Sequence, residues 1–218
     1  NFFLFVNMYE FWFVVGSQEL YGEETLKQVE KNSIEIVNAL NAGGLLPYPL
    51  VYKDTIKTAE GVTALVKEAN YADQCAGIVT FCHTFSPSKM WINGLGLLQK
   101  PWCHFHTQFN FEIPNEGIDM DYMNLHQSAH GDREHGYIGT RMHKGRKVIA
   151  GYWGDAEVQK KLGRWQKAAA GAAFSKSLKV MRFGDNMREV AVTEGDKVEA
   201  QIRFGWQVNT FPVGALVE

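Results

Sequence analysis

The sequence of 218 residues contains few cysteines, no large excess of charge of one sign and no long apolar runs. Its three cysteines, Cys75, Cys82 and Cys103, are odd in number, and no two of them have the CxxC spacing. We therefore expect neither a disulfide framework nor a structural zinc site, and we expect a reducing, cytoplasmic compartment. The 22 basic and 24 acidic residues form no long run of either sign and give a net charge of −2. This balance argues against nucleic-acid and anionic-membrane partners.

Residues 1–15 are rich in phenylalanine and valine, which raises the question of a targeting or membrane segment. The stretch has no basic region at its start, Asn7 and Glu10 interrupt it, and no small-residue cleavage site follows it. It is also shorter than the about 20 residues that a helix needs to span a bilayer. We expect a flexible leader that runs into a buried first strand.

Several common chemical motifs are missing. The sequence contains no GxxxxGK[ST] phosphate-binding loop and no GxSxG nucleophile elbow. Gly94-Leu95-Gly96 is expected late in a helix or just after it, so it lacks the strand-to-helix setting of a dinucleotide-binding fingerprint.

Two pairs of histidines have spacings that metal sites use. His104 and His106 would face the same side of one strand, and His126 and His130 are four residues apart. The segment HQSAH, however, lacks the glutamate of the HExxH pattern. For both pairs, packing or hydrogen bonding is favoured over metal ligation, and we predict no metal ligand in this chain.

Short apolar runs alternate with amphipathic segments five times along the first three quarters of the chain. The helix within residues 119–141 is expected in pieces, broken near Gly131 and Gly136, and another is expected to begin at Ser86-Pro87 with Ser86 as its cap. Apolar runs without alternation are typical of strands covered on both faces. The pattern predicts an α/β fold, a parallel sheet with helices on both faces. The predicted strands are residues 11–15, 48–52, 76–81, 102–106 and 148–152.

The pattern changes after about Lys176, which predicts an α/β domain over residues 1–176 and an incomplete, β-rich second unit over residues 177–218. Residues 180–183, 189–193 and 198–204 are predicted as strands with no helix between them. Residues 194–197 would form the hairpin turn that joins the last two strands.

Polar loops follow three of the predicted strands, at residues 16–22, 83–86 and 106–110. Ligands of parallel sheets bind beyond the carboxyl ends of the strands. Amides, hydroxyls, imidazoles and aromatic rings gathered there suit a small polyol, although ordinary loops have the same composition. Two charged clusters, residues 130–134 and 182–189, are further candidates for a functional site. The alternative is that the first is a solvated helix end and the second a polar connection. A histidine such as His130 can polarise a carbonyl or hydroxyl group.

Five blocks of the sequence resemble the L-arabinose isomerase family, and the resemblance runs from about Tyr9 to the last residue. They are residues 12–22 (WFVVGSQELYG), 83–94 (HTFSPSKMWING), 106–110 (HTQFN), 118–125 (IDMDYMNL) and 182–197 (RFGDNMREVAVTEGDK).

The resemblance implies an aldose–ketose isomerase that converts L-arabinose to L-ribulose, and in many members also D-galactose to D-tagatose. It implies an N-terminal α/β domain similar to that of fucose isomerase, a central domain, a C-terminal β domain and a homo-oligomer, a hexamer in the full-length family. It implies a divalent cation, usually Mn²⁺, held by two glutamates and two histidines that follow Glu218 in the family. It also implies substrate-binding roles for five residues of this chain, with His130 as a catalytic candidate: Gln18, Leu20, Phe85, His130 and Met187.

Because those metal ligands fall outside these 218 residues, we expect the chain to be inactive alone, either as a fragment or as a short natural form. Two alternatives remain: a non-catalytic sugar-binding or oligomerisation module, and a related sugar isomerase such as a fucose isomerase.

Overall fold

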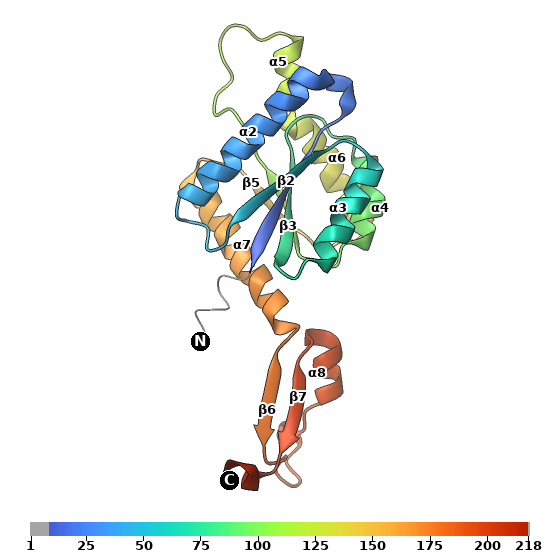
Figure 1. Ribbon diagram of the computed structural model, residues 1–218, viewed down its shortest axis with the longest axis vertical. Helices are drawn as coiled ribbons and strands as arrows, with labels where there is room; N and C mark the ends of the chain where they lie inside the picture. Colours follow the sequence, from blue (N-terminus) through green and yellow to red (C-terminus); the bar gives the residue numbers. More distant parts are fainter. Residues whose placement is uncertain (1–8, 218) are drawn as a thin grey trace. The chain divides into compact units, whose positions relative to one another are not determined.

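The computed structural model describes residues 9–217, which form two compact units divided between Lys167 and Ala168 (Figure 1). The dividing point lies inside α7, Ala156–Ser175. The leader expected before the first strand, residues 1–8, lies outside the described residues. Within residues 9–217, no helix is both long and apolar enough to cross a bilayer.

The first unit is built on a five-stranded sheet in which every pair of neighbouring strands is parallel, in the order β2-β1-β3-β4-β5. The predicted α/β fold with a parallel sheet is therefore confirmed. The strands are β1 Glu10–Gly16, β2 Leu50–Ile56, β3 Cys75–Cys82, β4 Trp102–His106 and β5 Lys147–Ala150.

Helices cover both faces of this sheet, as the unbroken apolar strands predict (Figure 1). On one face, Phe11 packs on Trp165 of α7 with ring centroids 5.2 Å apart, and α2 buries Val29, Ile36 and Leu40. On the other face, Trp12 belongs to a core cluster that includes residues of α3, α4 and α6. The helical segments of this unit are η1 Glu19–Tyr21, α2 Gly22–Ala42, α3 Ala59–Tyr71, η2 Ser88–Trp91, α4 Ile92–Leu97, α5 Met120–Leu125 and α6 Ser128–Arg141, with the first part of α7.

The expected helix breaks near Gly131 and Gly136 are wrong. The chain breaks instead at His126 and Gln127, between α5 and α6, and α6 runs without interruption through both glycines. A glycine inside a helix costs only about 1 kcal/mol relative to alanine, which packing of the helix on the sheet can offset. Here Gly131 is buried where the helix approaches the loop after β3.

The expected cap at Ser86 is also wrong. The helical segment begins at Ser88, after Pro87, and its first backbone N–H donates to Glu134 Oε2 on α6 at 2.9 Å. The hydroxyl of Ser86 instead accepts a hydrogen bond from Trp91 Nε1 at 3.0 Å. A carboxylate from another helix thus replaces the local cap.

The second unit contains a parallel strand pair, β6 Lys179–Phe183 and β7 Gln207–Phe211, joined through α8, Lys197–Phe204. The prediction of strands at 189–193 and 198–204 with a hairpin between them is therefore wrong. Asp196 caps α8 by accepting from the Glu199 backbone N–H at 2.8 Å, and Gly205 ends it in the left-handed conformation. Parallel strands need a crossover connection, which a hairpin cannot supply. Two short 3-10 segments, η3 Ala191–Thr193 and η4 Val213–Leu216, complete the unit.

Candidate functional site

The polar loops after β1 and β3 meet at the point where the strand order reverses, since β2 lies on one side of β1 and β3 on the other. In open parallel sheets, this crevice at the carboxyl ends is where ligands bind. Ser17 follows β1, and its buried Oγ lies 2.8 Å from Thr84 Oγ1 in the loop after β3. One hydroxyl–hydroxyl bond therefore ties the two loops together.

Gly16, the last residue of β1, makes the close approach of these loops possible. A Cβ at this position would lie 2.5 Å from Ser86 Oγ and 3.0 Å from the ring of Trp91. Because real Cβ atoms do not approach other atoms so closely, only glycine lets the loop after β3 fold over the end of β1. Packing at the sheet edge thus requires glycine at position 16.

His83 stands buried behind these loops and links three elements. Its Nδ1 donates to the Leu125 carbonyl at 3.1 Å, and its Nε2 accepts from Asn32 Nδ2 of α2 at 3.0 Å. Gln28 Nε2 in turn donates to Asn32 Oδ1 at 2.6 Å. Burial lowers the pKa of His83 to about 4, so the ring is neutral near pH 7. A neutral imidazole with one donor and one acceptor fits both of its partners.

Four of the five residues expected to surround a sugar lie around this edge. The rings of Phe85 and His130 are 4.7 Å apart between centroids, with Phe85 half-buried and His130 exposed. Gln18 is half-buried directly before η1, and Leu20 in η1 is 83 % exposed. Met187 belongs to the second unit, where its side chain is 65 % exposed. The roles of all five stay predictions.

Two further contacts bring the start of α6 to the β1 and β3 loops. Gln127 Nε2 donates to the hydroxyl of Tyr21 at 3.2 Å, which joins the end of η1 to the junction of α5 and α6. A Cβ on Gly131 would lie 3.1 Å from both Thr84 O and Ser86 N. The helix therefore approaches the loop after β3 as closely as its backbone allows.

The pair His104 and His106 faces one side of β4, as the alternation of a strand predicts, and both rings meet Asp132 of α6. His104 Nε2 lies 2.6 Å from Asp132 Oδ1, and His106 Nε2 lies 3.0 Å from Asp132 Oδ2. The second contact is short but does not have hydrogen-bond geometry, and Oδ2 has no hydrogen-bond partner. Burial raises the pKa of Asp132, and the two histidines oppose that shift.

His104 is held from its other side by a buried network on the sheet. Its Nδ1 lies 2.9 Å from Thr80 Oγ1, which accepts from Trp102 Nε1 at 2.9 Å and lies 3.3 Å from His135 Nε2. Burial holds the pKa of His135 well below its ordinary value, so this ring is neutral. The network fixes the ring plane of His104 toward Asp132.

His126 and His130 are not paired on one helix, because the chain breaks between them. His126 packs on the ring of Tyr122 with centroids 4.4 Å apart, whereas His130 packs on Phe85. Their four-residue spacing in sequence therefore does not become a pair on one helix face.

A hollow of about 270 Å³ lies beyond the ends of β4 and β5. Its lining combines the imidazole of His106 with the amide of Gln108 and the ring of Tyr152. Thr107, also in the lining, is buried with no hydrogen-bond partner for its Oγ1. The loop at residues 106–110 thus carries polar groups at the sheet edge, as its composition predicts.

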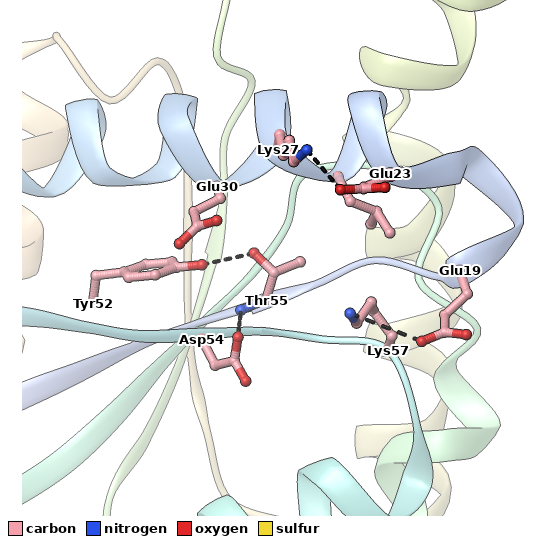
Figure 2. A pocket seen from close by; sticks show the side chains of 9 residues that line it. Glu19, Glu23, Lys27, Glu30, Tyr52, Asp54, Thr55 and Lys57 are labelled. Carbon is pink, nitrogen blue, oxygen red and sulfur yellow. Dashed lines mark hydrogen bonds and ion pairs between the residues drawn. The ribbon is translucent and has the colours of Figure 1, made fainter.

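Another hollow, between α2 and β2, is lined by different kinds of side chain (Figure 2). Lys57 Nζ lies 3.8 Å from Glu19 Oε1, and the hydroxyls of Tyr52 and Thr55 are 2.8 Å apart. Burial is the main cause that raises the pKa of Tyr52 to about 12. Charged and already paired groups line this hollow, unlike the amides, hydroxyls and rings at the strand ends.

Sequence patterns missed Asn32 as part of this site and named Asp132 only as a member of the charged cluster at residues 130–134. Asn32 lies inside a long amphipathic helix, where nothing in the local sequence distinguishes it from a surface residue. Asp132 stands in the charged segment 130–134, for which a solvated helix end was the alternative, yet it is only 4 % exposed. The available signal was the combination of two histidines on one side of a strand with an acidic residue beside a helical glycine.

Comparison with known proteins gives matches along almost the whole chain. Residues 5–177 match the L-arabinose isomerase N-terminal domain, and residues 179–218 match the L-arabinose isomerase central domain. The chain is 60 % identical over 210 residues to the L-arabinose isomerase of Geobacillus stearothermophilus and 61 % identical over 208 residues to L-arabinose isomerase 2 of Clostridium acetobutylicum. These matches cover 96 % and 95 % of this chain but 42 % and 43 % of the relatives. The chain thus spans less than half the length of the curated relatives it matches.

Proposed function

Because the chain belongs to the L-arabinose isomerase family, we propose that it supplies the sugar-facing part of an enzyme that interconverts L-arabinose and L-ribulose, and also D-galactose and D-tagatose. Such an isomerisation moves a hydrogen between two neighbouring carbons through an enediol, with a general base and a general acid at the reacting atoms. The observation that carries the proposal is the meeting of three family blocks, residues 12–22, 83–94 and 118–125, at the carboxyl edge of the sheet, where the rings of Phe85 and His130 are in contact.

In this proposal, each residue at the edge has a role that suits its chemistry. The amide of Gln18 and the imidazole of His130 exchange hydrogen bonds with sugar hydroxyls. The ring of Phe85 packs on the CH face of the sugar, and Leu20 adds apolar contact. Met187, which belongs to the second unit, keeps the substrate-binding role that the resemblance implies as a prediction. The buried bonds of Ser17 and His83 hold the loops that carry these groups.

Manganese is the cation that the resemblance implies, and we find no site that suits it among residues 9–217. Over residues 9–217, the cluster that could hold a cation is formed by Cys82, His104 and Asp132. Manganese prefers carboxylate, carbonyl and water ligands, and a thiol ligand suits softer ions. We therefore propose, as the resemblance implies, that the manganese ligands lie outside residues 9–217, and we derive no step of the reaction through that ion.

We further propose a cytoplasmic homo-oligomer that binds neither nucleic acid nor membranes. Three buried cysteines without disulfides are typical of a reducing compartment. Large apolar side chains are exposed on the loop after β4 and on α5, at Phe111, Ile113, Met120 and Met123. Exposed apolar surface of this kind marks protein–protein contacts, so it supports a neighbouring polypeptide at this edge.

The test measures ribulose formation from L-arabinose with manganese by the purified chain, alone and co-expressed with the unmatched part of the Geobacillus stearothermophilus relative. We expect no turnover by the chain alone and turnover by the combination. His130→Ala is expected to weaken arabinose binding in the combination by about 2–10-fold, the loss of one hydrogen bond of about 0.5–1.5 kcal/mol.

His143→Asn serves as the control, because His143 is an exposed histidine away from the edge whose φ of 50° asparagine tolerates. Turnover by the chain alone would contradict the assignment of the metal ligands to another segment. A folded combination in which His130→Ala and His143→Asn behave alike would contradict the role of His130. Polyol binding without turnover in any combination would favour a non-catalytic sugar-binding module.

A further inference from the structure

We infer that Cys82, His104 and Asp132 form a buried binding site for a thiophilic divalent cation, with zinc as the ion that fits best. Within residues 9–217, the ligand atoms of these three side chains all lie within 4.8 Å of one another. They come from the end of β3, the middle of β4 and the second turn of α6. The site is separate from Phe85 and His130, to which we assign the sugar.

The backbone is built to bring these three elements together. A Cβ on Gly131 would lie 3.2 Å from Cys82 Cβ, so this glycine allows α6 to pack directly on the end of β3. The next residue, Asp132, is thereby carried under the sheet edge, where its side chain is fully buried. Cys82 and His104 are themselves 0 % and 2 % exposed.

An unsatisfied carboxylate oxygen is the second observation that points to a cation. Asp132 Oδ1 accepts from His104, whereas Oδ2 is buried and has no hydrogen-bond partner. Buried charges in proteins are paired or coordinate metals. His106 Nε2 lies 3.0 Å from Oδ2, and its side chain is 38 % exposed. His106 therefore offers a path of entry from solvent to the three clustered ligands.

The hydrogen bonds around His104 match those of a metal-binding histidine. With an ion on Nε2, the ring proton must reside on Nδ1, and Thr80 Oγ1 lies 2.9 Å from Nδ1 to accept it. Metal-bound histidines almost always donate the other ring N–H in this way. Thr80 can then donate its own proton to His135 Nε2 at 3.3 Å. The partners that orient the ligand are thus in place without the ion.

Charge and ligand chemistry select the ion. A thiolate and a carboxylate together neutralise a divalent cation, which suits a site closed to water. Cysteine, histidine and aspartate are all zinc ligands, at about 2.3, 2.0–2.1 and 2.0–2.2 Å. Tetrahedral coordination at those lengths separates ligand atoms by about 3.4 Å, so the bond from His104 to Asp132 must open by about 0.8 Å. Binding releases about one proton, from the Cys82 thiol.

The experiment titrates cobalt(II), as a coloured substitute for zinc, into the full chain after removal of metals with a chelator. We expect one bound ion per chain, a sulfur-to-cobalt charge-transfer band, and loss of that band when zinc is added. Calorimetry of zinc binding in buffers of different ionisation enthalpy should report the release of about one proton.

Loss of a residue that only hydrogen-bonds to a metal ligand weakens metal binding by roughly 10–100-fold. Because Cys82 and Asp132 would bind the ion directly, Cys82→Ser and Asp132→Asn are expected to weaken zinc binding by more than this. Cys75→Ser is the matched control, because Cys75 is an equally buried cysteine at the opposite end of β3, outside the cluster. Circular dichroism checks that each variant is folded.

Failure of the unmodified chain to bind zinc or cobalt at micromolar concentration would overturn the proposal. Binding of cobalt without the sulfur-to-cobalt band would also overturn it. This measurement uses the unmodified chain, so it remains decisive even if Cys82→Ser does not fold. Equal binding by Asp132→Asn and Cys75→Ser would also overturn it. None of these results depends on isomerase activity.

Discussion

The buried histidine behind the sheet edge, His83, should make the first unit sensitive to mild acid. In the folded protein, burial lowers the pKa of His83 to about 4, against an ordinary value of 6.5 in an unfolded chain. Below pH 6.5 the unfolded chain therefore binds a proton that the folded chain does not bind. Because the unfolded state is favoured by proton binding, stability falls as the pH is lowered from 6.5 toward about 4.

The size of this loss follows from the difference between the two pKa values. Each unit of pKa corresponds to about 1.36 kcal/mol, so the full difference of about 2.5 units is worth about 3.4 kcal/mol. At pH 5, which is 1.5 units below 6.5, the loss is already about 2 kcal/mol. That is a large fraction of the roughly 5–15 kcal/mol by which proteins are stable.

His83→Gln removes the titrating group and keeps one donor and one acceptor for Leu125 and Asn32. It gives up the ring contacts to Phe81 and Phe109, at centroid distances of 5.5 and 6.1 Å. We expect this variant to be less stable than the natural chain by about 1–2 kcal/mol at pH 7.5. Near pH 5 the difference should vanish or change sign, because only the natural chain loses the about 2 kcal/mol.

The assay is urea denaturation at several pH values between 7.5 and 5, in buffers that contain a chelator so that metal binding does not contribute. The free energy of unfolding is compared between the natural chain and His83→Gln, with His143→Asn as a control for the removal of an exposed imidazole. Stability curves of the natural chain and His83→Gln that run parallel, within about 0.5 kcal/mol over this range, would refute a neutral buried His83.

Three glycine substitutions test the packing directly. Gly131→Ala should lower the free energy of unfolding by about 1–3 kcal/mol, because its Cβ would meet the loop after β3 at 3.1 Å. Gly136→Ala in the same helix meets nothing within 4 Å and should instead raise it by about 0.5–1 kcal/mol, so equal effects in urea denaturation would argue against the close approach of α6. Gly205→Ala should destabilise the second unit by about 2 kcal/mol, since its φ is 79° and its Cβ would lie 2.6 Å from Lys176 Cα. Faster amide exchange in β7 is the readout, and unchanged exchange there would count against it.

The sequence alone was enough for the architecture of the first unit. Apolar runs such as residues 11–15 have no polar alternation, and a strand of that kind needs cover on both faces, which the helices on either side of the sheet supply. The periodicity that marks a strand or helix is carried by near neighbours in the chain, so it can be read locally. The family blocks are also continuous segments, and the matching domains cover them.

Local patterns were insufficient where two conformations have similar signals. Residues 196–204 contain β-branched and aromatic residues as well as a cap at Asp196 and an ion pair from Glu199 to Arg203. The helix forms, and the parallel pairing of β6 and β7 requires a crossover of this kind. The choice therefore depended on the pairing of strand residues 28 positions apart, such as Lys179 with Gln207, which local periodicity does not report.

The carboxyl-edge site depended still more on tertiary structure. The sequence placed His104 and His106 on one side of a strand, and alternation alone was sufficient for that. Asp132 lies 28 residues from His104 and reaches it only because the strand order sets β4 beside β3 and Gly131 lets α6 approach. The sequence alone thus predicted which residue types lie at the edge. The partners of each side chain depended on the order of the strands and on the close packing of α6.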